Sequence, residues 1–236
     1  MSLKLDPKKI VTVLSACIAF LFLAGVTVNV FDQVLGHHRL FGLVHWLDLD
    51  TESNIPTWYQ SSTLLACSVL LCLIGRSRAG LKDGFAGQWT ALAVIFAFLS
   101  IDEATQIHEN IGFLLSDLLR EQNRSVFPWV FVGGLFFAVV AVVYARFVLK
   151  LPPRTRKGFI VSAALYVSGT LLLELCGAVF YTKKNGDMSI YYHLVADAEE
   201  LFEMLGVLFF IRTLLSYLTD ELKLSLSFGS RNEHER

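Results

Sequence analysis

The stretch that decides the fold lies near the start of the chain, where residues 10–31 read IVTVLSACIAFLFLAGVTVNVF. It contains no Asp, Glu, Lys, Arg or His. The hydrocarbon core of a bilayer is about 30 Å thick, and an α-helix of roughly 20 apolar residues crosses it at about 1.5 Å per residue. The stretch therefore predicts a transmembrane helix.

Five further apolar stretches of similar length follow, at 58–75, 88–110, 127–150, 158–181 and 193–217. The whole chain of 236 residues is 54% hydrophobic and 17% charged, whereas a soluble domain carries about 45–50% apolar and 25% charged residues. The net charge of −1 argues against a nucleic-acid partner, which leaves a basic footprint. We predict an all-α, polytopic membrane protein with six transmembrane helices in one bundle.

The basic residues orient this bundle. Most lie before the first span, between the second and third, between the fourth and fifth, or at the end of the sixth: Lys4, Lys8, Lys9, Arg76, Arg78, Lys82, Lys150, Arg154, Arg156, Lys157, Arg212, Lys223, Arg231 and Arg236. The opposite side holds Arg39, Arg120, Arg124, Lys183 and Lys184. The positive-inside rule then places both termini in the cytoplasm, and we expect a bacterial inner membrane.

The segments outside the spans complete the single domain, 1–236. Residues 34–47 alternate apolar side chains with His37, His38, Arg39 and His45, which predicts an amphipathic helix lying in the outer interface. Residues 218–236 read as a polar cytoplasmic tail. Spans 58–75 and 127–150 carry no ionisable side chain in their cores, so we expect both at the lipid-facing periphery.

The informative feature is charge where lipid is expected. The spans contain eight acidic residues, listed here in chain order: Asp102, Glu103, Glu109, Glu174, Asp197, Glu199, Glu200 and Glu203. A charged side chain at the middle of a bilayer costs at least about 2.5–3.5 kcal/mol. These side chains must therefore face protein, a wet cavity or one another.

The helical rise places the acids of three spans at one level. Asp102 lies about 21 Å and Glu174 about 24 Å above the inner face, while Glu200 and Glu203 lie about 10 and 15 Å below the outer face. On a regular helix Asp102 and His108 would face about 120° apart, so the span 88–110 is either central and wrapped by protein or distorted at this point. Glu199 would point away from the stripe of His193, Asp197, Glu200 and Glu203. We expect an acidic site in the outer half of the membrane.

The leading interpretation is a membrane metalloenzyme acting on a lipophilic substrate. Carboxylates with histidines suit iron, zinc or manganese. Both a dimetal-carboxylate oxidoreductase and a zinc hydrolase fit, although no Glu-x-x-His is present. The predicted metal ligands are Glu103, His108, Glu109, Glu174, His193 and Glu200. Asp102, Asp197 and Glu203 are the predicted catalytic acids and bases or supporting groups.

Two other functions use the same residues. Intramembrane carboxylates also mark the pathways of proton- or cation-coupled transporters and channels. Alternatively, the acids could form a structural network or a docking surface for a partner subunit or a second copy of the chain. Membrane lipids and a lipophilic small molecule or cation are the remaining expected partners.

A second acidic motif follows the first span, where Asp48, Asp50, Glu52 and Asn54 alternate with other residues. The spacing resembles the start of a calcium loop, but the sixth and twelfth positions hold Ser53 and Tyr59 in place of glycine and an acid. We expect a solvated acidic turn, with Asn54 capping the next helix; calcium is the less favoured metal.

Overall fold

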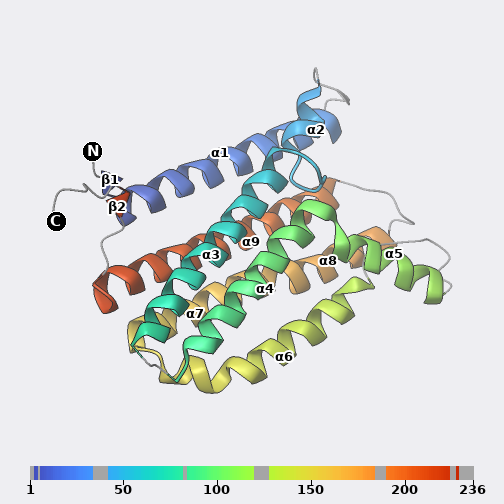
Figure 1. The fold of residues 1–236 in the computed structure, drawn as a ribbon. Helices are drawn as coiled ribbons and strands as arrows, with labels where there is room; N and C mark the ends of the chain where they lie inside the picture. Colours follow the sequence, from blue (N-terminus) through green and yellow to red (C-terminus); the bar gives the residue numbers. More distant parts are fainter. Residues whose placement is uncertain are drawn as a thin grey trace.

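The computed structural model describes residues 3–4, 6–33, 42–81, 84–119, 128–183, 190–223 and 227–228. Helices dominate this part of the chain (Figure 1), in the order α1 (Pro7–Gln33), α2 (Leu43–Leu47), α3 (Ile55–Gly80), α4 (Ala86–Thr105), α5 (Ile107–Leu119), α6 (Trp129–Lys150), α7 (Pro153–Val167), the π-helical η2 (Ser168–Leu173), α8 (Glu174–Lys183), α9 (Ile190–Ser216) and the π-helical η3 (Tyr217–Glu221). A two-residue strand β1 (Leu3–Lys4) pairs antiparallel with β2 (Ser227–Phe228).

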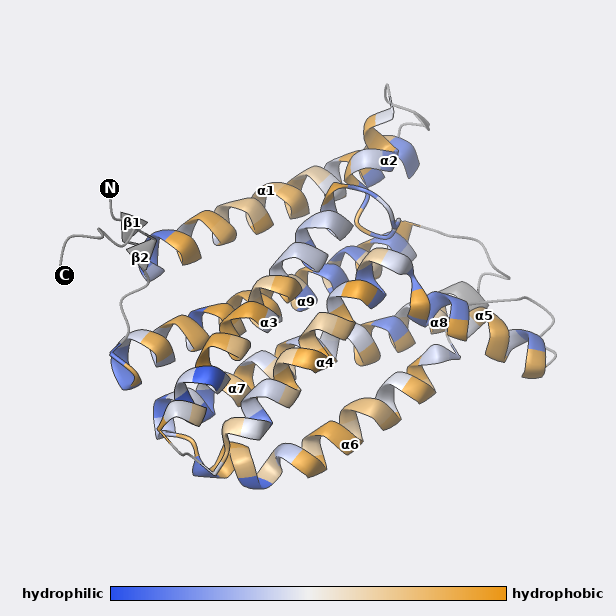
Figure 2. Ribbon diagram, in the orientation of Figure 1, coloured by the Kyte–Doolittle hydropathy of each residue, from blue (hydrophilic) through white to orange (hydrophobic). Residues whose placement is uncertain are grey.

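The long helices confirm the coarse prediction of an α-helical, multi-pass membrane protein. Five described helices are long and apolar enough to cross a membrane, and a sixth span results if α4 and α5 are counted as one bent pair. Figure 2 shows that hydrophobic residues occupy most of the length of these helices and that hydrophilic residues lie mainly toward their ends. Of the predicted interface helix, α2 covers the last part, and residues 34–41 lie outside the described residues.

Helix α9 is the centre of the bundle. It packs against α1, α3, α7, η2 and α8, and it contributes the largest group of buried residues among the helices. Its mixed sequence explains this position, because a helix that carries acids on an otherwise apolar surface must be surrounded by protein. The predicted tail begins later than expected, since Leu218 within η3 is fully buried.

The end of the bundle that contains η3 is held by aromatic packing. The ring of Trp89 on α4 lies 5.0 Å from that of Phe147 on α6, 5.7 Å from Phe159 on α7 and 4.9 Å from Tyr217 in η3. Arg78 donates to the Tyr217 hydroxyl and lies over its ring. The pairs with Phe147 and Phe159 are edge-to-face and that with Tyr217 is tilted. Aromatic pairs stabilise a core beyond their buried area, so this packing joins four elements.

The peripheral positions differ from the expectation in one case. Helix α3 packs against α4 and α9, and its residues Leu64, Cys67 and Leu71 are fully buried. Small polar side chains allow this close contact: Ser61 Oγ donates to the main-chain oxygen of Ser100, and Ser68 Oγ to that of Ala93. Helix α6 is peripheral as expected, with only Gly133, Tyr144 and Phe147 buried.

Candidate functional site: an acidic cavity at one end of the bundle

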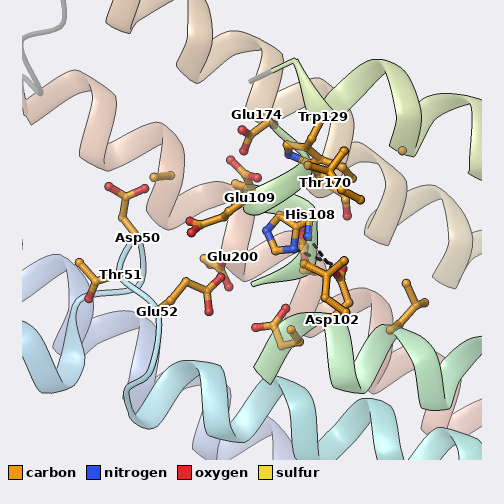
Figure 3. Close-up of a pocket in the computed structure, with 18 of the residues that line it drawn as sticks. Asp50, Thr51, Glu52, Asp102, His108, Glu109, Trp129, Thr170, Glu174 and Glu200 are labelled. Carbon is orange, nitrogen blue, oxygen red and sulfur yellow. Dashed lines mark hydrogen bonds and ion pairs between the residues drawn. The ribbon is translucent and has the colours of Figure 1, made fainter. Parts of the chain in front are cut away.

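A cavity of about 710 Å³ lies at the end of the bundle opposite the aromatic cluster. It is formed by the loop after α2, the α4–α5 junction, the first turns of α6, the π-helical segment with α8, and the first half of α9 (Figure 3). Eleven carboxyl side chains line it: Asp32, Asp48, Asp50, Glu52, Asp102, Glu103, Glu109, Glu174, Glu199, Glu200 and Glu203. We call this space the acidic cavity.

The described lining contains little positive charge to balance these acids. His108 and His193 are its only basic side chains, and no described lysine or arginine lines it. Two protonated histidines could offset two of eleven carboxylates. The remaining acids must hold protons or face a bound cation, because like charges at short range in a medium of low dielectric constant repel strongly.

A sharp break in the third span builds one wall. The span bends by 69° between α4 and α5. Gln106, between the two helices, has a positive φ of 58°. The span predicted over 88–110 is therefore broken at this point, which agrees with the second of its two alternatives, a distorted helix. The break is stabilised by Asp102, whose Oδ1 accepts from the main-chain nitrogen of His108 at 2.8 Å and so caps α5.

The same break pairs two of the predicted site residues. Nδ1 of His108 lies 3.2 Å from Oδ2 of Asp102, and the ring of Trp129 lies 5.0 Å from the imidazole. A regular helix would have turned the two side chains apart. With Nδ1 directed at the carboxylate, Nε2 is the nitrogen that remains for a ligand or a proton.

The loop between α2 and α3 closes another side of the cavity. Asn54 holds it together: its Nδ2 donates to the main-chain oxygens of Asp48 at 2.6 Å and Thr51 at 2.7 Å, and its Oδ1 accepts from the main-chain nitrogen of Thr57 at 3.1 Å. This confirms Asn54 as the cap of α3. The loop is therefore a folded wall of the site, whereas the sequence indicated a solvated turn.

Asp50 in this loop reaches the first turns of α9. The hydroxyl of Tyr192 donates to its Oδ1 at 3.3 Å, and Nδ1 of His193 lies 3.8 Å from its Oδ2. Burial raises the pKa of Asp50 to about 7, and the neighbouring charge of Asp48 adds to the increase. Burial also raises the pKa of Glu52 to about 7, against the opposing effect of His108.

These two shifts predict how stability depends on pH in the metal-free protein. A carboxyl group with a higher pKa in the folded state binds protons more tightly there, so stability should fall as the pH rises from about 4 to about 7 and then level off. Differential scanning fluorimetry of EDTA-treated protein should show this fall. Asp50→Asn should make the slope shallower; a melting temperature that rises over this range would contradict the assignment.

A π-helical segment forms the wall opposite the loop. In η2, a Cβ at Gly169 would lie 2.7 Å from the main-chain oxygen of Glu199 and 3.2 Å from the main-chain nitrogen of Glu203. Only glycine allows this approach to α9. The hydroxyl of Thr170 donates to the main-chain oxygen of Tyr166 at 2.8 Å, and Thr170, Glu174, Glu199 and Glu203 all line the cavity. Single π-helical turns within α-helices are frequent at functional sites.

Eight of the nine predicted site residues line the acidic cavity: Asp102, Glu103, His108, Glu109, Glu174, His193, Glu200 and Glu203. The ninth, Asp197, is not among the lining residues. It is 1% exposed and accepts a hydrogen bond at 3.0 Å from Asn29, which is buried to the same extent. This pair ties α1 to α9 beneath the site.

Sequence reasoning missed part of the lining. It treated Asp48, Asp50 and Glu52 as a separate calcium candidate, turned Glu199 away from the site and did not consider Tyr166, Thr170 or Tyr192. The alternating acids after the first span were the one available signal for the loop. Within the described ranges, no three His, Cys, Asp or Glu side chains stand close enough together to hold a metal ion without rearranging.

The chain belongs to a protein family described as a domain of unknown function (DUF8692), whose family model matches residues 11–218. The matched stretch includes every carboxyl residue that lines the acidic cavity. No curated protein matches the chain, and no solved structure does.

Proposed function

We propose that the protein is a membrane metalloenzyme that binds a divalent metal ion in the acidic cavity. One observation carries the proposal: eleven carboxyl groups and two histidines, with no described lysine or arginine, line a single cavity inside an apolar helical bundle. Intramembrane ionisable residues are costly and mark functional sites, and a cation relieves their mutual repulsion.

The donor set favours iron, zinc or manganese over calcium. Carboxylates combined with imidazole suit these metals, whereas calcium prefers oxygen ligands alone. We assign Glu103, Glu109, Glu174 and Glu200 with His108 and His193 as the proposed ligands. This set is compatible with a dimetal-carboxylate oxidoreductase and with a zinc hydrolase; in either case the bound metal would activate water or oxygen.

The remaining residues have roles that follow from their contacts. Asp102 is a positioning residue, because it orients His108 and caps α5. Glu203 is the proposed acid or base, since its side chain is buried and lines the cavity. We reassign Asp197 from the catalytic set to the support of α9, because its Oδ1 is taken by Asn29 outside the cavity.

A transporter is less well supported by the surroundings of the cavity. An ion pathway needs polar groups on both sides of the membrane, but the space that continues from the acidic cavity along α4, α6, α7 and α9 is lined almost entirely by apolar side chains. A purely structural network would pack its polar groups against one another, whereas these groups surround an open volume.

We also propose that both termini are cytoplasmic, that the membrane is a bacterial inner membrane and that the chain forms a single domain.

Elemental analysis tests the metal. Protein purified in detergent through a tag without histidines should carry about one or two transition-metal ions per chain. The double variant Glu103→Gln, Glu200→Gln should lose this metal while retaining its helical circular dichroism. Glu221→Gln is the matched control, because Glu221 lies in η3, about 30 Å along the helix from Glu200.

The decisive negative outcome is wild-type protein that is fully folded, contains no metal, and takes up neither iron, zinc nor manganese on dialysis. Such a result would refute the metalloenzyme proposal and leave a structural network or a transporter as the remaining functions.

A further inference from the structure

A second cavity adjoins the first inside the bundle. It has a volume of about 430 Å³ and lies between α4, α6, α7 and α9. Its lining is apolar apart from a few hydroxyl groups, and no described charged side chain contributes to it. Both volumes fall in the range of about 300–1,000 Å³ that is usual for ligand pockets. We call this second space the apolar cavity.

The two cavities share part of their walls. Leu99, Phe136, Phe137 and Tyr166 line both of them. Along α9, Glu203 lines the acidic cavity, and Gly206 and Phe210 line the apolar cavity one and two turns later. The acidic cavity therefore continues along the helix axes into the apolar cavity.

The apolar cavity borders the surface that faces lipid. Its lining includes Ala141, Ala145 and Leu149 of α6 and Ile160 and Ala163 of α7, all of which are exposed. In Figure 1, α6 runs along one edge of the bundle. A molecule dissolved in the bilayer could therefore enter between α6 and α7 without crossing water.

The dimensions and the charge identify the class of ligand. From Phe136 to Leu149 the cavity follows α6 over thirteen residue-to-residue steps, or about 20 Å, which is the length of an extended hydrocarbon chain of roughly 16 carbons. At the other end, two divalent ions would supply four positive charges against eleven carboxyl groups, because histidines that bind a metal are neutral. A positively charged head group complements the remaining acids, whereas a phosphate or carboxylate head group is repelled.

We propose that the two cavities together bind a single-chain cationic amphiphile, a long-chain amine, with its ammonium head in the acidic cavity and its hydrocarbon chain in the apolar cavity. This inference rests on the proposed function and gives its substrate class. The head lies next to the proposed metal ligands, and Tyr166, at the junction of the cavities, contacts the start of the chain.

Photolabelling tests the assignment. The probe is a 16-carbon primary amine with a diazirine at mid-chain, added to the protein in phosphatidylcholine nanodiscs. Labelling should saturate, be competed by unlabelled hexadecylamine, and map by peptide mass spectrometry to α6 and α7. The 8-carbon amine and the 16-carbon carboxylate with the same photoreactive group should each label at least about fivefold less, since they lack the chain contact and the charge match.

Two variants that fill the apolar cavity, with one matched control, test whether the hydrocarbon chain of the amphiphile binds there. Ala141→Phe and Ala163→Phe add a ring to the lining and should each lower labelling at least about fivefold. Ala138→Phe adds the same ring to an exposed position of α6 that does not line the cavity, and it should label like the wild type. Melting temperatures of the three variants identify any that fail to fold.

The outcomes separate this inference from the proposed function. Labelling that does not saturate, or that is equal in Ala141→Phe, Ala163→Phe and Ala138→Phe, overturns chain binding in the apolar cavity. Equal labelling by the carboxylate probe overturns the cationic head. Because metal content is measured on the same nanodiscs, metal without saturable labelling refutes the amphiphile alone, and saturable labelling without metal refutes the metalloenzyme alone.

Discussion

Replacing Asp102 with asparagine is expected to weaken Zn²⁺ binding by about 10- to 100-fold, the usual effect of removing a carboxylate that supports a histidine ligand. Asparagine can keep the cap of α5 through its Oδ1, which accepts from the His108 main-chain nitrogen in the native structure. Its amide group, however, would present a donor to Nδ1 of His108 in place of the Oδ2 acceptor. The imidazole would then accept at Nδ1 and carry its proton on Nε2, which could no longer bind the metal.

Isothermal titration of the EDTA-treated protein with Zn²⁺ measures this effect. Asp220→Asn is a suitable control, because Asp220 pairs with Arg154 on an exposed surface, where ion pairs contribute little. Circular dichroism should be the same for both variants, since the cap is retained. Equal affinities in Asp102→Asn and Asp220→Asn would remove His108 from the proposed ligands.

The second large effect is expected at the π-helical segment. Gly169→Val places a branched side chain where even a Cβ would lie 2.7 Å from the main-chain oxygen of Glu199. Backbone cannot yield as a side-chain tip does, so the substitution should cost about 3 kcal/mol, the upper end of the usual overpacking penalty. For a chain of this length that corresponds to a melting temperature lower by roughly 6–12 °C.

Gly177→Val provides the matched comparison. Gly177 lies on α8, where the nearest atom to an added Cβ is 3.7 Å away, on the ring of Tyr192. Thermal unfolding in detergent should therefore separate the two variants by several degrees. If both melt at the temperature of the wild type, the close packing of η2 against α9 is not present in the protein.

Much of the architecture could be predicted from the sequence, because hydrophobic length and helical rise are simple physical quantities. Counting about 1.5 Å per residue placed Asp102, Glu174 and Glu200 at one depth, and all three line the acidic cavity. Side-chain detail is not needed for this prediction, because acids in a bilayer must face one another or water.

The break between α4 and α5 could not be predicted in the same way. No glycine or proline stands at the junction, and Gln106 adopts the left-handed conformation without the residue type that favours it. The capping contact from Asp102 offsets this cost, but it joins residues six apart, a spacing that a regular helix never brings together. The different facing of Asp102 and His108 therefore left a distorted helix open as an alternative, but local sequence patterns did not predict where the helix breaks or by how much.

The positions of the loop after α2 and of the π-helical segment in the cavity wall could not be predicted for related reasons. The contact of Asp50 with Tyr192 and His193 joins residues more than 140 positions apart, which a single sequence does not encode locally. The π-helical η2 leaves the hydrophobic run of 158–181 intact, because widening one turn changes the facing of side chains and not their polarity. Tyr166, Thr170 and Glu199 were missed as a result.

The sparse anchoring of α6 has a mechanical consequence. Among the described helices that are long enough to span a membrane, α6 has the fewest buried residues, so its displacement breaks the fewest packing contacts of any span. Bilayer thickness acts on such a helix through tilt, at fractions of a kcal/mol per ångström of mismatch. The lipid composition of the host membrane is therefore expected to change the distance between α6 and α7.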